Sequence, residues 1–246
     1  MANRKSVICA KAFSVILLTI ILPLISSCKK SPAPSANSQQ PAVTSDKPVE
    51  MVPLDNNLPK PVYRGTKQDI RVPNLEPFGI PRPKFYVPKG TTNVALGKPV
   101  TASDLIPIIG ELKMVTDGDK EAVDGSYVQL GPLLQYITVD LQSEFNIYAI
   151  WVWHYHLEAR VYFDVIVQVA DDPDFTKNVI TLFNNDIDNS AGLGVGKDMH
   201  YIETNQGKLI DAKGVKARYV RLYSRGNSSD DLNNYTEVEV YAKSAN

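Results

Sequence analysis

From residue 91 onward, the chain consists of short segments in which apolar and polar residues alternate, separated by turn residues. Residues 135–141 (QYITVDL) and 163–170 (FDVIVQVA) show this alternation, and no window of about a dozen residues shows the 3.6-residue period of a helix. The expected strands are 135–141, 146–156, 163–170, 179–183, 218–224 and 236–241. Short strands separated by turns predict an all-β fold, a sandwich or a barrel, and about 150 residues suffice for one hydrophobic core.

The first 28 residues are typical of a secretion signal that ends in a lipid attachment site. Residues 1–11 are basic, and residues 12–25 are apolar except for Ser14 and Thr19. Fourteen helical residues span roughly 21 Å, short of the ~30 Å hydrocarbon core of a bilayer. This run therefore predicts the hydrophobic region of a signal peptide rather than a membrane span. Residues 24–28 (LISSC) then resemble a bacterial lipobox.

The lipobox resemblance implies that residues 1–27 are removed as a lipoprotein signal peptide and that Cys28 is acylated. Lys29, rather than Asp, follows this cysteine, which by resemblance to lipoprotein sorting in diderm bacteria favours the outer membrane of the cell envelope. Attachment through several acyl chains is stable, whereas a single chain binds only marginally. The alternative is an ordinary signal peptide with a chance cysteine. The other cysteine, Cys9, lies in the signal, so neither a disulfide framework nor a four-thiolate zinc site is expected.

Residues 28–90 have the composition of a tether, since twelve of the 17 prolines lie between residues 29 and 90. Residues 31–50 predict a flexible, partly polyproline spacer. Residues 61–90 contain recurrent apolar and aromatic side chains, which a purely solvated linker does not need. We therefore expect an extended arm that packs partly on the following domain, residues 91–246.

The folded part is acidic, and its motifs do not indicate an enzyme. Residues 91–246 carry 13 basic and 22 acidic groups, a net charge of −9, which argues against nucleic acid as the main partner. The glycine-containing loop 184–197 lacks the spacing of dinucleotide- and phosphate-binding loops. No serine-nucleophile, zinc-protease or catalytic-triad pattern is legible.

Five segments occur in the order, and with the spacing, of the discoidin or coagulation factor five/eight type C domain. They are 93–103 (NVALGKPVTAS), 115–119 (VTDGD), 137–141 (ITVDL), 217–222 (ARYVRL) and 236–241 (TEVEVY). The resemblance covers about residues 92–243 and implies an antiparallel jelly-roll β-sandwich of the galactose-binding type. Such domains are related to family 32 carbohydrate-binding modules and fucose-binding lectins. The family's tryptophan before the Val-Asp-Leu strand is absent, because Gln135 and Tyr136 stand there.

Residues 114–126 (MVTDGDKEAVDGS) concentrate oxygen donors. Hard cations such as Ca²⁺ take six to eight oxygen ligands, whereas the alternative is a solvated acidic turn. The resemblance implies a structural calcium ion between this loop and the last strand. The implied ligands are the carboxylates of Asp117 and Glu237, Ser126, and carbonyl groups near Met114, Asp119 and Thr236. A buried Glu237 without a partner would also be costly, which favours a cation or a basic neighbour.

His154-Tyr155-His156 ends an expected strand, and Arg160 follows in a loop. Residues two apart in a strand point to one face, so both imidazoles can contact one ligand. The resemblance implies that Arg160 and one histidine bind sugar hydroxyls. It also implies that Tyr155, Tyr162 and Tyr127 are stacking platforms. The alternatives are a transition-metal site and core histidines that are satisfied by backbone groups.

These observations favour a non-catalytic carbohydrate-binding lipoprotein displayed on the bacterial cell envelope. Its expected partners are a glycan and a membrane, through the lipid anchor. The alternative is an envelope scaffold or adhesion protein that binds another protein through the sandwich or the 61–90 arm. An enzyme is the remaining option.

Overall fold

The computed structural model describes residues 48–55, 57–62 and 69–245. The predicted signal peptide, Cys28 and most of the predicted spacer lie outside the described residues. The described residues belong to one compact unit. In this part of the chain, no helix is long and apolar enough to cross a membrane.

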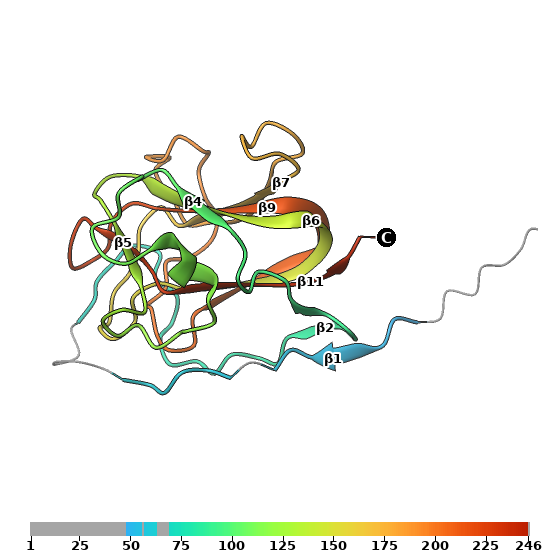
Figure 1. The fold of residues 1–246 in the computed structure, drawn as a ribbon. Coiled ribbons are helices and arrows are strands. Elements are labelled where there is room, and N and C mark those ends of the chain that lie inside the picture. The colour runs from blue at the N-terminus through green and yellow to red at the C-terminus, as the bar shows by residue number, and fades with distance from the viewer. Residues whose placement is uncertain (1–47, 56, 63–68, 246) are drawn as a thin grey trace, which may run out of the picture. The chain divides into compact units, whose positions relative to one another are not determined.

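Two long strands, β6 (Gln135–Trp153) and β9 (Lys208–Ser224), pair antiparallel and build both layers of a sandwich (Figure 1). Their register shifts at 140–145 and again at 147–149, and Gln142 adopts a left-handed φ of 66° at the first shift. Bulges of this kind bend strands. The first half of β6 and the last half of β9 therefore lie in one layer. The last half of β6 and the first half of β9 lie in the second layer.

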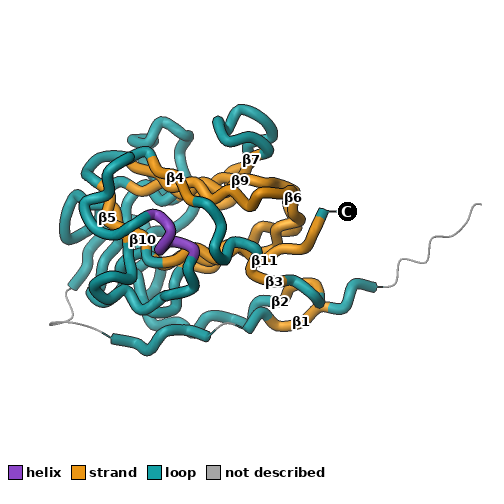
Figure 2. Tube along the Cα trace, in the orientation of Figure 1, coloured by secondary structure: helices purple, strands orange, loops and turns teal. Residues whose placement is uncertain are grey.

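The remaining strands complete the two layers, and all ladder pairs are antiparallel. The first layer contains β4 (Val100–Ala102), β7 (Ile166–Ala170) and β8 (Ile180–Asn184) beside the two long strands. The second layer adds β3 (Thr92–Asn93) and β11 (Glu237–Ser244). A short pair, β5 (Val128–Leu130) with β10 (Asn233–Tyr235), and a single 3₁₀ turn, η1 (Leu112–Thr116), close one end (Figure 2). The predicted all-β antiparallel sandwich is confirmed.

The core lies between the layers and follows the alternation of the sequence. Ile137, Val139 and Leu141 of β6 are fully buried in one apolar cluster. Val167 and Val169 of β7 join the same cluster from the neighbouring part of the layer. Burial of each such side chain is worth roughly 1.5–3 kcal/mol, so the two-residue period fixes which face of each strand points inward.

A second apolar cluster lies on the outer face of the second layer. It contains Ala149, Trp151, Trp153 and Tyr241, and it is covered by Leu54 and Phe85 of the arm together with Leu209. The arm itself forms a two-stranded pair, β1 (Met51–Pro53) with β2 (Tyr86–Pro88), along the outer side of this layer (Figure 1). Since both faces of this part of β6 are buried, its sequence is a nearly continuous apolar run.

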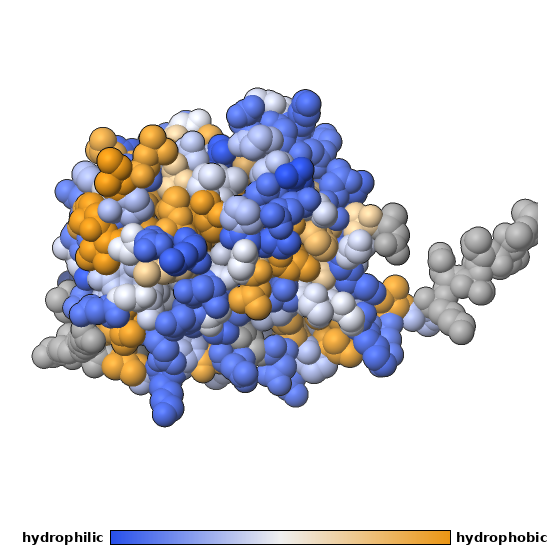
Figure 3. Space-filling view, viewed as in Figure 1, coloured by the Kyte–Doolittle hydropathy of each residue, from blue (hydrophilic) through white to orange (hydrophobic). Residues whose placement is uncertain are grey.

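One loop exposes apolar side chains at the end of the sandwich that carries β5 (Figure 3). Leu105 is 87% exposed and Ile106 is 83% exposed, with Leu133 exposed beside them in the next loop. The Asp104 carboxylate accepts hydrogen bonds from the backbone N–H groups of Ile106 and Gly131. These bonds hold the two loops together.

Candidate functional site

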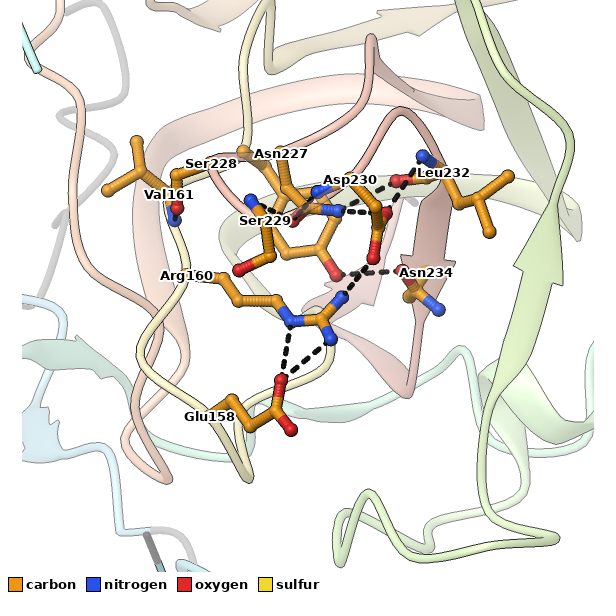
Figure 4. A network of polar contacts seen from close by, with 10 residues as sticks. Glu158, Arg160, Val161, Asn227, Ser228, Ser229, Asp230, Leu232 and Asn234 are labelled. Carbon is orange, nitrogen blue, oxygen red and sulfur yellow. Dashed lines mark hydrogen bonds and ion pairs between the residues drawn. The ribbon is translucent and has the colours of Figure 1, made fainter. Parts of the chain in front are cut away.

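A polar network on the loops after β6 and β9 is the candidate functional site (Figure 4). Arg160 donates from Nη1 to Asp230 Oδ2 at 2.9 Å, and from Nη2 and Nε to Glu158 Oε2 at 2.8 and 3.3 Å. The Arg160 side chain is 13% exposed, whereas those of Glu158 and Asp230 are 43% and 35% exposed. Although burial lowers the pKa of Arg160, hydrogen bonding to Glu158 and the charge of Asp230 raise it overall. The site thus presents two partly exposed carboxylates around one guanidinium.

The loop that carries Asp230 is held by its own hydrogen bonds. Asn227 donates from Nδ2 to Asp230 Oδ1 at 2.7 Å and to the Leu232 carbonyl at 3.0 Å. Its Oδ1 accepts the backbone N–H groups of Ser229 and Asp230. Asn227 also forms an isolated bridge with Tyr162, in the loop of Arg160. These contacts fix the position of the carboxylate before any ligand arrives.

Tyr155 lies beneath the guanidinium of Arg160. The central carbon of the guanidinium is 4.8 Å from the ring centroid, a distance that permits a cation–π contact. Tyr127 is buried and contacts Tyr155 edge-on, with ring centroids 5.2 Å apart. The structure therefore brings Arg160, Tyr155 and Tyr127 together, and that they bind a sugar stays a prediction.

The two histidines lie inside the molecule and have different partners. His154 Nδ1 is 2.6 Å from Glu203 Oε1, and its ring stacks on Tyr162 with centroids 4.4 Å apart. His156 Nε2 is 2.7 Å from the carbonyl oxygen of Lys120. Both side chains are buried. The structure does not bring the two rings to one exposed site, and in this packing they position the neighbouring loops.

The calcium ligands implied by the sequence resemblance come from two parts of the chain that meet at Glu237. The backbone N–H of Gly118 donates to Glu237 Oε2 at 3.1 Å, and Oε1 has no hydrogen-bond partner among the described residues. The pKa of Glu237 is raised to about 9, chiefly by burial and also by the charges of Glu239 and Asp117, although the hydrogen bond from Gly118 lowers it. The residue is fully buried. An orphaned carboxylate oxygen in such a site fits a bound cation.

The other implied calcium ligands differ in which hydrogen bonds their side chains already make. Asp117 is exposed, and its Oδ1 accepts the backbone N–H of Asp119. Ser126 Oγ donates to Asp119 Oδ2 at 2.6 Å, so this pair is engaged within the loop. Thr236 donates its hydroxyl to the His154 carbonyl, and Met114 Sδ accepts the backbone N–H of Glu111. Neither of the last two contacts involves the carbonyl oxygens of Met114 and Thr236 that the resemblance implies as ligands.

A second group of carboxylates lies in the loops before β7 and after β8. One carboxylate oxygen from each of Asp164, Asp186 and Asp188 lies within 4.8 Å of the others. The Asp186 carboxylate accepts backbone N–H groups of Asp188, Ser190 and Ala191, which explains its burial without a cation. Burial raises the pKa of Asp164 despite a hydrogen bond from Ser190. These residues shape the loop.

Sequence reasoning did not single out Glu158, Asp230 or Glu203. Glu158 has only its closeness to Arg160 as a signal, and Asp230 lies 70 residues away from Arg160 along the chain. Asn233 and Asn234 of β10 lie close to this network in the chain but are buried. Asn233 bonds Ser224 and Gly226, and Asn234 accepts the Tyr162 hydroxyl. Only the three-dimensional approach of the loops identifies which polar residues remain accessible.

No family model and no curated protein matches the chain. Among solved structures, it is similar to the CBM32 of AlyQ in complex with 4,5-unsaturated mannuronic acid, at 21% identity and a TM-score of 0.43, over 58% of this chain and 92% of that one. It is also similar to a fucose binding module from Streptococcus pneumoniae, at 19% identity and a TM-score of 0.43, over 62% and 98% of the two chains.

A family 89 glycoside hydrolase from Clostridium perfringens, in complex with PUGNAc, is 20% identical with a TM-score of 0.46. This comparison covers 62% of the present chain and 15% of the hydrolase. At these identities and TM-scores, the likenesses carry no function over to this chain. The function must be argued from its own residues.

Proposed function

We propose that this protein is a non-catalytic carbohydrate-binding lipoprotein of the bacterial cell envelope. The observation that carries the glycan part is the Arg160 network, in which Glu158 and Asp230 remain partly exposed around a guanidinium that lies on Tyr155. Sugar hydroxyl groups both donate and accept hydrogen bonds, and carboxylates beside a guanidinium offer both kinds of partner. Groups that are already held in place cost less to order when a ligand binds.

The same network argues against glycoside hydrolysis. Hydrolysis requires one carboxylic acid as proton donor and a second carboxylate on the other side of the sugar bond. Here Glu158 and Asp230 both bind one guanidinium. They serve as acceptors for a ligand and not as an acid–base pair.

The proposal includes a structural calcium ion at Glu237. The buried, unpartnered Oε1 atom of Glu237 and the neighbouring Asp117 support it, as does the preference of Ca²⁺ for oxygen ligands. Asp117 and Glu237 would supply carboxylates, and carbonyl groups of the 114–126 loop would complete the set. The cation would neutralise Glu237 and hold this loop against β11.

The first test compares matched arginine variants on an array of immobilised glycans. Arg160→Ala removes the guanidinium between the two carboxylates, and we expect the apparent Kd for bound glycans to rise by about tenfold or more. Arg218→Ala is the control, because Arg218 also bonds one carboxylate with two nitrogens and lies 4.9 Å from a tyrosine ring, that of Tyr219. Equal binding by the wild type and Arg160→Ala, or an equal loss in both variants, would contradict the proposal.

The alternative is an envelope scaffold that binds another protein. The exposed loop of Leu105 and Ile106 favours it, because soluble proteins rarely expose contiguous apolar side chains without a function. No glycan binding by the wild type, together with a protein partner that is lost in Ile106→Asp and retained in Arg160→Ala, would establish this alternative.

A further inference from the structure

A cleft of about 530 Å³ lies between the arm and the sandwich, and Arg160 is not one of the residues that line it. Its size falls in the range of small-molecule sites. Residues 76–83 of the arm form one side, and residues 199–209 form the other. Neither side alone encloses the space. The cleft is therefore a feature of the arm and the domain together.

The arm is fixed at both ends of this cleft. At one end, the Glu76 N–H donates to the His200 carbonyl at 2.8 Å, and Lys208 Nζ bonds Glu76 Oε2 at 2.7 Å. At the other end, Arg82 donates to the carbonyls of Gln206 and Gly207. Residues 77–81 pass between these two anchors. The walls are thus held apart at a defined distance.

The two walls differ in chemistry. Thr204, Asn205 and Gln206 form a polar wall on a turn that is closed by the hydrogen bond from Gly207 N to the Thr204 carbonyl at 3.0 Å. The exposed apolar side chains of Phe78, Ile80 and Met199 also line the cleft. The cleft is therefore amphipathic.

Tyr201 also lines the cleft, but its hydroxyl is buried. The residue is 3% exposed and belongs to the apolar core of the sandwich. Burial raises the pKa of the hydroxyl, and the neighbouring Glu203 carboxylate raises it further. The polar groups that a ligand in the cleft can reach are therefore those of the 204–206 wall.

Charges in the cleft are already paired. Lys208 and Glu76 bind each other, and Arg82 is engaged with backbone carbonyls. A charged ligand would have to break one of these contacts. A peptide that binds by strand addition would need a free strand edge, but the turn at 204–207 offers none, and His200 already pairs with Leu75 of the arm. A neutral ligand with a hydroxylated edge and an apolar face fits best, which is the chemistry of a sugar ring.

We propose that this cleft is a second glycan-binding site, specific for neutral oligosaccharides and formed jointly by the arm and the sandwich. The inference rests on the proposed function for its ligand class, but it uses different residues. The two sites can therefore fail separately.

The test titrates neutral tri- and tetrasaccharides, chosen from array hits, into the full chain by calorimetry. Ile80→Asp places a charge in the apolar wall, and Gln206→Ala shortens the polar wall but keeps the backbone carbonyl that Arg82 and Trp151 use. Val49→Asp is the control, because it adds the same charge to the arm outside the residues that line the cleft, at a similar exposed fraction, 65% against 67% for Ile80. Melting temperatures verify that each variant folds.

Tryptophan emission provides a second readout. The only two tryptophans, Trp151 and Trp153, donate to the carbonyls of Gln206 and Asn205 on the polar wall. A ligand in the cleft is expected to shift this emission. We expect Ile80→Asp and Gln206→Ala to raise the Kd by about tenfold and to reduce the shift, while Val49→Asp leaves both unchanged.

The outcomes separate the two proposals. Binding lost in Arg160→Ala and retained in both cleft variants would overturn the cleft site and leave the proposed function standing. Two binding events, of which only one is lost in the cleft variants, would support both sites. No binding of any glycan by the wild type would overturn both proposals.

Discussion

At the scale of single residues, Glu237 is a buried carboxylate whose Oε1 atom has no hydrogen-bond partner among the described residues. It is fully buried at the start of β11, and one carboxylate oxygen accepts only the Gly118 N–H. Asp117 and Glu239 add negative charge, whereas Lys120 opposes it and is itself paired with Glu239. Either a proton or a cation must neutralise this carboxylate in the folded protein, because a buried unpaired charge is costly.

This choice between proton and cation predicts a pH-dependent stability. The folded-state pKa of Glu237, about 9, lies above its usual value of 4.5, so the folded protein binds a proton that the unfolded chain has released at neutral pH. In the absence of a cation, the contribution of Glu237 to the free energy of unfolding is therefore greatest below about pH 4.5. This contribution falls as the pH rises toward 9, by at most about 1.4 kcal/mol per pH unit.

The measurement is thermal unfolding in chelator and in calcium, from about pH 5 to about pH 8. We expect the melting temperature in chelator to fall with pH more steeply for the wild type than for Glu237→Gln. Added calcium is expected to raise the wild-type melting temperature, most at high pH, because a ligand of the folded state alone stabilises by mass action. Identical pH profiles, or a calcium response that survives in Glu237→Gln, would refute the site.

The residues of the candidate site were only partly predictable from the sequence. Arg160 and Tyr155 are close in the chain, so their meeting follows from local spacing. The two-residue period also places His154 and His156 on one side of an extended segment, but it does not say what covers that side. Glu203 and the loop at Lys120 cover them, and these contacts depend on the tertiary fold.

At the scale of elements, β6 and β9 show which strands the alternation of apolar and polar residues predicts and which it misses. The alternation at 135–141 and the apolar run at 146–156 predicted two separate strands. In the structure they are parts of one strand, β6, because a bulge rather than a turn lies between them. The first half of β9, residues 208–217, was not predicted. Its Lys, Asp and Gly residues obscure the alternation, although Ile210 and Ala212 are buried.

The arm is a further element whose contacts predict a measurable effect. Arg82 donates to two carbonyls and lies 5.0 Å from the Trp151 ring. Its burial lowers its pKa despite nearby Glu76 and Glu203. Removing these contacts in Arg82→Ala should cost about 1–3 kcal/mol, or roughly 2–9 °C in melting temperature for a domain of this size.

Arg71→Ala is the matched control, because Arg71 lies on the same arm and its ion-pair partner among the described residues is the exposed Asp69. We expect no measurable change in that variant. Tryptophan emission should shift to longer wavelength in Arg82→Ala as water reaches Trp151. An unchanged melting temperature and spectrum in Arg82→Ala would mean that the arm does not stabilise the sandwich through this contact.

At the scale of the whole molecule, charge is distributed unevenly along the chain. Residues 29–90 carry 10 basic and 5 acidic groups, whereas residues 91–246 carry a net charge of −9. A basic tether next to an anionic membrane surface is attracted to it, and an acidic domain is repelled. With the proposed lipid anchor, this charge distribution would favour a domain that is held away from the membrane.

We predict that acylation of Cys28 anchors the whole molecule to a membrane. Cys28 follows the apolar segment at the position that the lipobox resemblance assigns to the acylated residue, and Cys9 lies within the predicted signal. The chain has only these two cysteines, so Cys28→Ser and Cys9→Ser form a matched pair. In cells that are fed a labelled fatty acid, we expect Cys9→Ser to carry the label and to remain with the membranes. We expect Cys28→Ser to lose the label and, once its signal is processed, to enter the soluble fraction, because no acyl chain then holds it at the bilayer. A Cys28→Ser protein that is still labelled, or a wild type that never is, would show that the segment is an ordinary signal peptide.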